Sequence, residues 1–274
     1  MSLTLSSGRI YREKSVKSQP QAALGEVRPF AQASSLLRVT GEARNHLPAR
    51  SGTCPPDGQP PLDEYYNSLF TAFGPQHWWP GQTRFEIIVG AILTQNTSWR
   101  NVERAIARLR AAGLLSPGRI EGVALARLEK LIRASGYFRQ KARKLKEFCA
   151  FLRREYRGSL ARMFDTPTLV LREKLLGVFG IGPETADSIL LYGGQHAVFV
   201  VDAYTRRMLL RHGWIDEKAK YDEIRWKFEQ QFPGDSGRLG EFHALIVDAG
   251  KKFCRRQEPL CASCPLGRYR EEGR

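Results

Sequence analysis

The sequence predicts an all-α fold. From Leu62 onward, apolar residues recur at the three- and four-residue spacing that places them on one face of a helix. Gly74, Gly113 and Gly136 follow such stretches, where glycine can end a helix. Strand signals are nearly absent, because the apolar run at residues 198–201 is too short to indicate a sheet.

Each expected helix has a local reason to begin or end where it does. Thr83 and Glu86 have the capping-box spacing, which predicts that a helix begins after Thr83. Thr166 and Pro167 predict an N-cap followed by proline at the first helical position. The other helices are expected at residues 62–73, before 113, at 125–135, 138–156, 203–212, 218–231 and 237–252.

Charge and cysteine usage limit the classes of partner. The chain has 274 residues and a formal net charge of +15, which indicates a polyanionic partner and favours nucleic acid over a membrane surface. No apolar run approaches the roughly 20 residues of a membrane-spanning helix, so no membrane partner is expected. Three of the five cysteines crowd near the C-terminus, which indicates a metal site in a reducing compartment more than disulfides.

Residues 1–61 are expected to form a basic, disordered arm. They are rich in Ser, Gly, Pro, Gln and Arg and show no sustained period, and residues 51–61 have the composition of a linker. An over-long gene model and an organelle transit peptide are alternatives for this segment, and Cys54 within it is expected to be an incidental thiol.

The segment at residues 175–206 predicts two helices joined by a tight turn and followed by an aspartate at the start of another helix. Gly180 and Gly182 lack Cβ atoms, so the turn can approach a ligand closely. Pro183 suits a first helical position, and the free N–H groups after it favour an anion such as a phosphate.

Four separated motifs then resemble one family. They are LTQNTS at 93–98, GIGPETAD at 180–187, VVDAYTRR at 200–207, and the cysteine series Cys254, Cys261 and Cys264. In this order they resemble the helix-hairpin-helix DNA glycosylases of the endonuclease III superfamily, over about three quarters of the chain. The resemblance implies a six-helix barrel at 83–201, a second lobe from 62–82 and 202–274, and a DNA cleft between them.

The same resemblance implies roles for particular residues. Asp202 would stabilise the positive charge of the sugar after base flipping, although it can also be a plain N-cap. The partner would be double-stranded damaged DNA, bound by a monomeric, cytoplasmic protein associated with the nucleoid. The expected DNA contacts are Gln95, which would fill the vacated gap, the hairpin residues Gly180, Ile181 and Gly182, and the loop arginines Arg255 and Arg256.

One departure from the family concerns the reaction. Bifunctional members have a lysine where this chain has Glu184, and a carboxylate cannot form a Schiff base. The sequence therefore predicts a monofunctional glycosylase in which Glu184 has a base-pocket or electrostatic role, or merely complements the helix dipole. WWP at 78–80 together with Glu184 resembles the 3-methyladenine glycosylase branch. The expected base pocket is Trp78, Trp79 and Trp99, with a core role as the alternative.

Two other functions remain as alternatives: a glycosylase and AP lyase for oxidised pyrimidines, and a non-catalytic helix-hairpin-helix DNA-binding protein.

The second departure concerns the metal site. The family's iron–sulfur loop has a fourth cysteine at the position of Arg270. A 4Fe–4S cluster on Cys254, Cys261, Cys264 and one other group, a zinc site with a distant fourth ligand, and a metal-free loop are the three alternatives.

Overall fold

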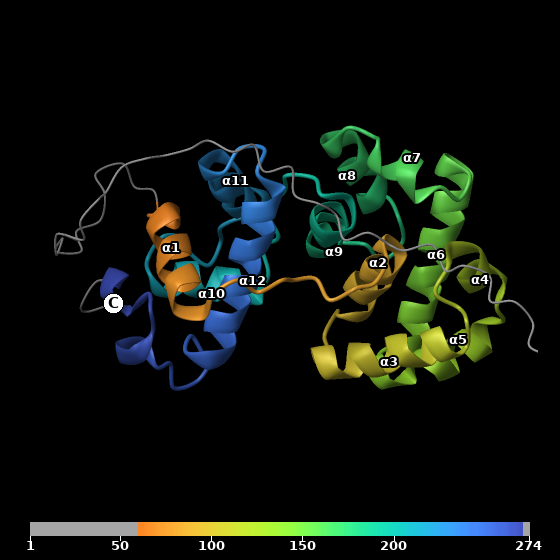
Figure 1. The fold of residues 1–274 in the computed structure, drawn as a ribbon, viewed down its shortest axis with the longest axis horizontal. Coiled ribbons are helices and arrows are strands. Elements are labelled where there is room, and N and C mark those ends of the chain that lie inside the picture. The colour runs from red at the N-terminus through yellow and green to blue at the C-terminus, as the bar shows by residue number, and fades with distance from the viewer. Residues whose placement is uncertain (1–59, 271–274) are drawn as a thin grey trace, which may run out of the picture. The chain divides into compact units, whose positions relative to one another are not determined.

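The computed structural model describes residues 60–270, and its regular structure in this range is helical (Figure 1). No strand occurs among these residues, which confirms the all-α prediction. The predicted arm at residues 1–61, with Cys54, lies almost wholly outside the described range. Within that range no helix is both long and apolar enough to cross a membrane.

The α-helices follow one another with short connections. They are α1 (Leu62–Phe73), α2 (Arg84–Leu93), α3 (Trp99–Ala111), α4 (Pro117–Gly122), α5 (Leu125–Ile132), α6 (Phe138–Tyr156), α7 (Leu160–Phe164), α8 (Thr168–Leu176), α9 (Pro183–Ser188), α10 (Ala203–Arg211), α11 (Tyr221–Gln231) and α12 (Ser236–Lys252). Shorter turns are η1 (Arg133–Ser135), the π-helical η2 (Ile189–Gly193), η3 (Cys261–Ser263) and η4 (Gly267–Tyr269).

Local signals placed most helix ends correctly, and two starts were wrong. The Thr83 hydroxyl accepts a hydrogen bond from the Glu86 N–H at 3.1 Å, as the capping-box spacing predicts. Helix α8, however, begins at Thr168, because Pro167 has an extended ψ of 140° and is itself the cap. Helix α11 begins at Tyr221 instead of 218, because the Asp216 carboxylate accepts a bond from the Lys218 N–H in a preceding turn.

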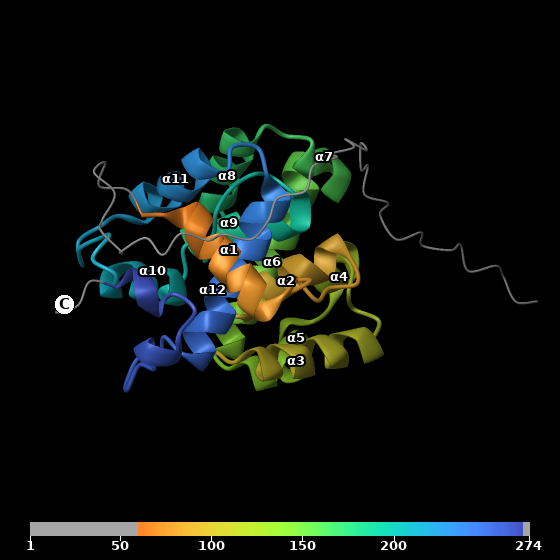
Figure 2. The same cartoon turned by 60° about the vertical axis from the view of Figure 1, so that its left-hand side comes forward.

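Helices from both ends of the described range pack together. Helix α12 contacts α1 and α10, and α1 also contacts α11 (Figures 1 and 2). Their shared core is aromatic: the Phe199 and Phe228 rings stack with centroids 3.7 Å apart, and Phe242 tilts against both. The first described helix, α1, therefore shares a core with the last three, α10 to α12.

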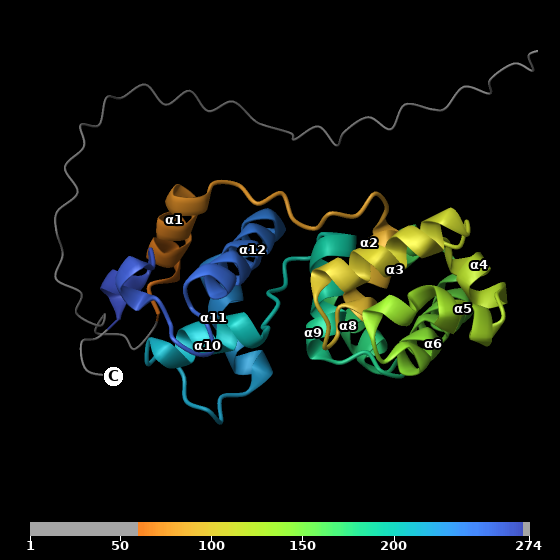
Figure 3. The same cartoon turned by 90° about the horizontal axis from the view of Figure 1, so that it is seen from below.

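The helices between them form a second set of contacts. Helix α2 packs on α3, α6, α9 and η2, while α6 also packs on α4, α5 and α7 (Figure 3). The π-helical turn η2 contacts α12, so the two sets meet there. The boundaries expected for the two lobes, at residues 83 and 202, stay a prediction.

Candidate active site

The hairpin consists of α8, a turn that contains Gly180, and α9. Gly180 has a φ of +78°, which favours glycine, and a Cβ at this position would overlap the side chain of Lys144 from α6. Ile181 is buried, so its side chain anchors the turn in the core. The exposed backbone of Gly182 and Pro183 is what the hairpin presents to solvent.

Gln95, the expected gap-filling residue, lies against this hairpin. Its amide nitrogen donates to the Gly180 carbonyl oxygen at 3.3 Å and to the Thr185 hydroxyl at 2.8 Å. Its amide oxygen accepts a hydrogen bond from the Lys144 ammonium group. Three contacts therefore hold the half-buried Gln95 side chain beside the turn, and Lys144 is a member of this group that the motif did not predict.

Asp202 is the N-cap of α10 and uses its two oxygens differently. Oδ1 accepts a hydrogen bond from the Thr205 N–H at 2.8 Å, and Oδ2 lies 3.6 Å from His243 Nε2. Burial alone would raise the pKa of Asp202, but the contacts with His243 and Thr205 outweigh it and hold that pKa below its usual range. The carboxyl group is therefore ionised at neutral pH.

Glu184 stands in the first turn of α9, near enough to Asp202 for their charges to interact. Its side chain retains contact with solvent although many protein atoms surround it. Partial removal from water, followed by the Asp202 charge, raises the pKa of Glu184 above its usual range. The two carboxyl groups thus have pKa values pushed in opposite directions, an arrangement typical of paired catalytic carboxylates.

The three predicted pocket tryptophans lie in one aromatic array. The Trp78 and Trp79 rings are nearly parallel with centroids 5.8 Å apart, and Trp99 meets Trp79 edge-on at 5.3 Å. Trp78 also stacks on His243, with centroids 5.6 Å apart and planes 5° from parallel. His243 therefore joins the tryptophan array to Asp202.

His243 and Tyr192 are site residues that sequence reasoning missed. The Tyr192 hydroxyl and His243 Nδ1 are hydrogen-bonded at 2.6 Å, while the buried Nε2 has no hydrogen-bond partner among the described residues and faces Asp202. Tyr192 also tilts against both Trp78 and Trp79. A lone histidine on the apolar face of a helix usually indicates a core position, so the sequence carried no clear signal for it.

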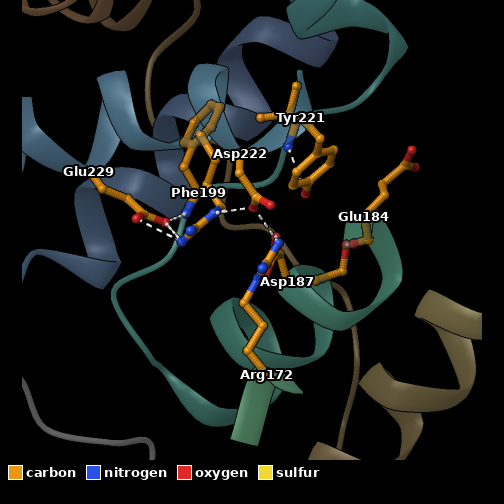
Figure 4. Close-up of polar contacts among 10 residues, drawn as sticks. Arg172, Glu184, Asp187, Phe199, Tyr221, Asp222 and Glu229 are labelled. Carbon is orange, nitrogen blue, oxygen red and sulfur yellow. Dashed lines mark hydrogen bonds and ion pairs between the residues drawn. The ribbon is translucent and has the colours of Figure 1, made fainter. Parts of the chain in front are cut away.

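A buried ion pair fixes the two helices of the hairpin to α11. The Arg172 guanidinium from α8 donates to both oxygens of Asp187 in α9, at 2.7 and 3.1 Å, and to Asp222 of α11 at 2.7 Å (Figure 4). In the same view Glu184 points away from this pair. One end of the short helix α9 is therefore held by ion pairs, and the other end bears the Glu184 carboxyl group.

The backbone that leads to Asp202 is also held by α11. The Phe199 N–H donates to a Glu229 carboxylate oxygen at 2.9 Å, and the Val201 N–H donates to the Tyr221 hydroxyl at 3.2 Å (Figure 4). These bonds take the place of strand pairing in the extended segment. They set the position from which Asp202 begins α10.

Cys254, Cys261 and Cys264, the expected cluster ligands, line one cavity, and none of them forms a disulfide. Burial, together with the nearby Cys254 and Cys261, raises the pKa of the Cys264 thiol. Arg270 lines the same cavity at the position of the missing fourth cysteine. No three His, Cys, Asp or Glu side chains within residues 60–270 are grouped closely enough to hold a single metal ion.

The loop arginines are solvent-accessible. Arg255 donates from Nε to the Lys252 carbonyl oxygen at 3.2 Å, and Arg256 lines an open groove. The groove also contains four other arginines, Arg206, Arg207, Arg211 and Arg270. This surface is strongly basic beside the cysteine loop.

Comparison of sequences identifies relatives across most of the chain. Residues 89–233 match the family described as HhH-GPD superfamily base excision DNA repair protein. A provisionally named DNA repair glycosylase of Methanocaldococcus jannaschii is 50% identical over 206 residues, which cover 74% of this chain and 93% of that protein. An endonuclease III of Sulfolobus acidocaldarius is 29% identical over 192 residues, or 69% of this chain and 83% of that protein.

Solved structures share the fold. The H. pylori 3-methyladenine DNA glycosylase bound to 1,N6-ethenoadenine aligns with a TM-score of 0.61 and 28% identity, covering 69% of this chain and 97% of that chain. A non-covalent endonuclease III–DNA complex aligns with a TM-score of 0.67 and 24% identity, covering 77% and 94%. At 24% identity, the endonuclease III–DNA complex shows a shared fold and nothing further.

Proposed function

Because the chain belongs to the HhH-GPD superfamily of base excision DNA repair proteins and is a DNA glycosylase, we propose that it removes alkylated purines, such as 3-methyladenine, by hydrolysis. The observation that carries this proposal is the Asp202 and Glu184 pair. Glu184 occupies the place where the bifunctional relatives have a lysine, and it interacts with an ionised Asp202. Without an amine at that place, water is the nucleophile and the DNA strand stays intact.

Asp202 would act on the sugar. Loss of the base leaves positive charge on the ring, and a carboxylate held in a fixed direction stabilises that charge and orients the attacking water. The bond from Thr205 N–H fixes the carboxylate, and Oδ2 is the oxygen on the side of His243. His243 would keep the orientation of Oδ2 through its own bond to Tyr192.

The tryptophans and Glu184 would act on the base. An alkylated purine such as 3-methyladenine is cationic, so electron-rich ring faces and a nearby carboxylate both attract it. Because a cationic base leaves readily, the site needs little acid strength.

The remaining predicted residues would hold the DNA. Gln95, fixed beside Gly180 by Lys144 and Thr185, would enter the gap left by the flipped nucleotide. The turn at Gly180–Gly182 and the exposed Arg255 and Arg256 would contact phosphates. Cys254, Cys261 and Cys264 would hold the iron–sulfur cluster of the family, which would stabilise the loop when bound. The monomeric state also stays a prediction.

Base release from methylated, uracil-containing and oxidised duplexes, compared side by side, tests the proposal. We expect release of the methylated purine by the wild type, loss of release in Asp202→Asn, and no covalent adduct after borohydride reduction on abasic DNA. An adduct through an amine would establish a lyase and contradict the hydrolytic step. Equal inactivity of wild type and Asp202→Asn on every duplex would support the non-catalytic alternative.

A further inference from the structure

A histidine shares the cavity of the three loop cysteines. His212 is the residue directly after α10, and it lines the cavity together with Cys254, Cys261 and Cys264. The cavity is enclosed by the ends of α10 and α12 and by the turns η3 and η4. Four side chains of metal-ligating type therefore line one cavity, although His212 lies 42 positions before Cys254 in the sequence.

The residue types around this cavity, three cysteines and a histidine, are ligands that an iron–sulfur cluster can use. A tetrahedral zinc ion draws its ligands onto one atom, and no such close group occurs in the described part of the chain. A 4Fe–4S cluster binds each ligand at a separate iron atom, so its ligands stand farther apart around a larger core. Side chains that line one cavity without forming such a close group are compatible with this larger core.

We propose that His212 Nε2 is the fourth ligand of a 4Fe–4S cluster held by Cys254, Cys261 and Cys264, in place of the cysteine absent at position 270. The inference rests on the cofactor of the family and is independent of the lesion that the enzyme removes. His212 Nδ1 is hydrogen-bonded to the Tyr65 hydroxyl at 2.7 Å, which leaves Nε2 for a metal bond. A ligating histidine generally binds a second partner through its other ring nitrogen in this way.

Charges around the cavity support this assignment. Arg211 Nη1 donates to Cys254 Sγ at 3.0 Å, which stabilises a thiolate. Arg270 lines the cavity but has no lone pair to offer iron, so it can balance charge and cannot ligate. Three thiolates and a neutral imidazole around a core of charge +2 leave one net negative charge, which the two arginines face.

The full chain, purified without oxygen, tests the assignment through metal content and spectroscopy. We expect about four iron atoms and four sulfides per chain. After reduction, the electron paramagnetic resonance spectrum should show coupling to a ring nitrogen, and labelling histidine with ¹⁵N should change that coupling. His212→Ala should lose the nitrogen coupling and, on brief exposure to air, convert to a three-iron form that the wild type resists.

A second variant separates ligand loss from misfolding. Arg270→Cys restores the family's cysteine, so His212→Ala/Arg270→Cys should regain about four iron atoms and resistance to air, without the nitrogen coupling. An intact wild-type cluster without nitrogen coupling, or one that already converts to the three-iron form in air, would overturn the assignment. Zinc in place of iron, or absence of metal from the folded wild type, would also overturn it and would leave the glycosylase proposal untouched.

Discussion

Substitution of Arg172 by methionine should destabilise the fold by about 3–5 kcal/mol at neutral pH, because it leaves a buried carboxylate without its counter-ion. The Asp187 side chain has no exposed surface, and that of Arg172 is 10% exposed. Both guanidinium bonds to Asp187 would be lost, and so would the bond to Asp222. The Asp222 side chain is 60% exposed, so water replaces that bond and most of the loss arises at Asp187.

The loss of stability caused by Arg172→Met should be smaller in acid, because Asp187 can then be protonated in the folded variant. Burial already raises the pKa of Asp187 above its usual range despite the opposing effect of Arg172. Removal of Arg172 raises that pKa further, so the folded variant binds a proton that the unfolded chain does not bind until lower pH. Stability of the variant therefore increases relative to wild type as pH falls from neutral towards the usual aspartate range.

Urea denaturation followed by circular dichroism at neutral pH and in acid measures the effect. Lys174→Met is the matched control, because Lys174 lies on the same helix in an exposed ion pair that contributes little. Asp187→Asn in the Arg172→Met background should recover part of the loss, since a neutral amide needs no counter-ion. A cost equal to that of the control, or one that does not change with pH, would refute the reasoning.

The remaining predictions concern pH and salt. The rate at which the wild type releases a cationic base should fall in acid as Glu184 is protonated, at a pH above the usual glutamate range because its pKa is raised. Single-turnover rates of Glu184→Gln should not show this fall in acid. Identical pH profiles for the two proteins would remove Glu184 from the mechanism. Burial, and after it the charge of Lys144, lowers the pKa of Lys141 to about 8. The unfolded chain therefore binds more protons than the folded one between about pH 8 and 10.5, and wild-type stability should rise over this range by up to about 3 kcal/mol. Lys141→Met should abolish that rise in urea titrations. The log–log salt slope of DNA binding should decrease by about 0.9 in Arg256→Ala and stay unchanged in Arg154→Ala, which removes an exposed arginine of α6. Equal slopes in the two variants would exclude a phosphate contact by Arg256.

Most helix ends could be predicted because their causes are local. The Thr83 hydroxyl accepts a hydrogen bond from the Glu86 N–H three residues later, and a glycine after α1 ends that helix wherever the rest of the chain lies. Pro167 shows the limit of such rules. Proline is compatible with both the cap and the first helical turn, and only the extended ψ of this residue distinguishes them.

The long-range partners of the site could not be predicted in the same way. Nothing local to His243 indicates that its ring stacks on Trp78 and faces Asp202, because these contacts depend on how α12 packs. Nothing local to Lys144 indicates either that its ammonium group donates to Gln95 beside the hairpin. Periodicity identifies the face that a residue occupies, and packing decides what that face meets.

Asp202 shows how a structural and a catalytic role can coexist in one carboxylate. Oδ1 receives the Thr205 N–H and completes the cap of α10, whereas Oδ2 faces His243. Asparagine caps a helix about as well as aspartate, so Asp202→Asn should keep α10 intact while it removes the negative charge from the site. Asp202→Ala loses both functions and should cost about 1 kcal/mol more in stability. Base release should therefore fall equally in the two variants, although only alanine lowers the urea midpoint appreciably. If asparagine retained wild-type release, capping would be the whole role of Asp202, and the catalytic charge would have to come from another residue.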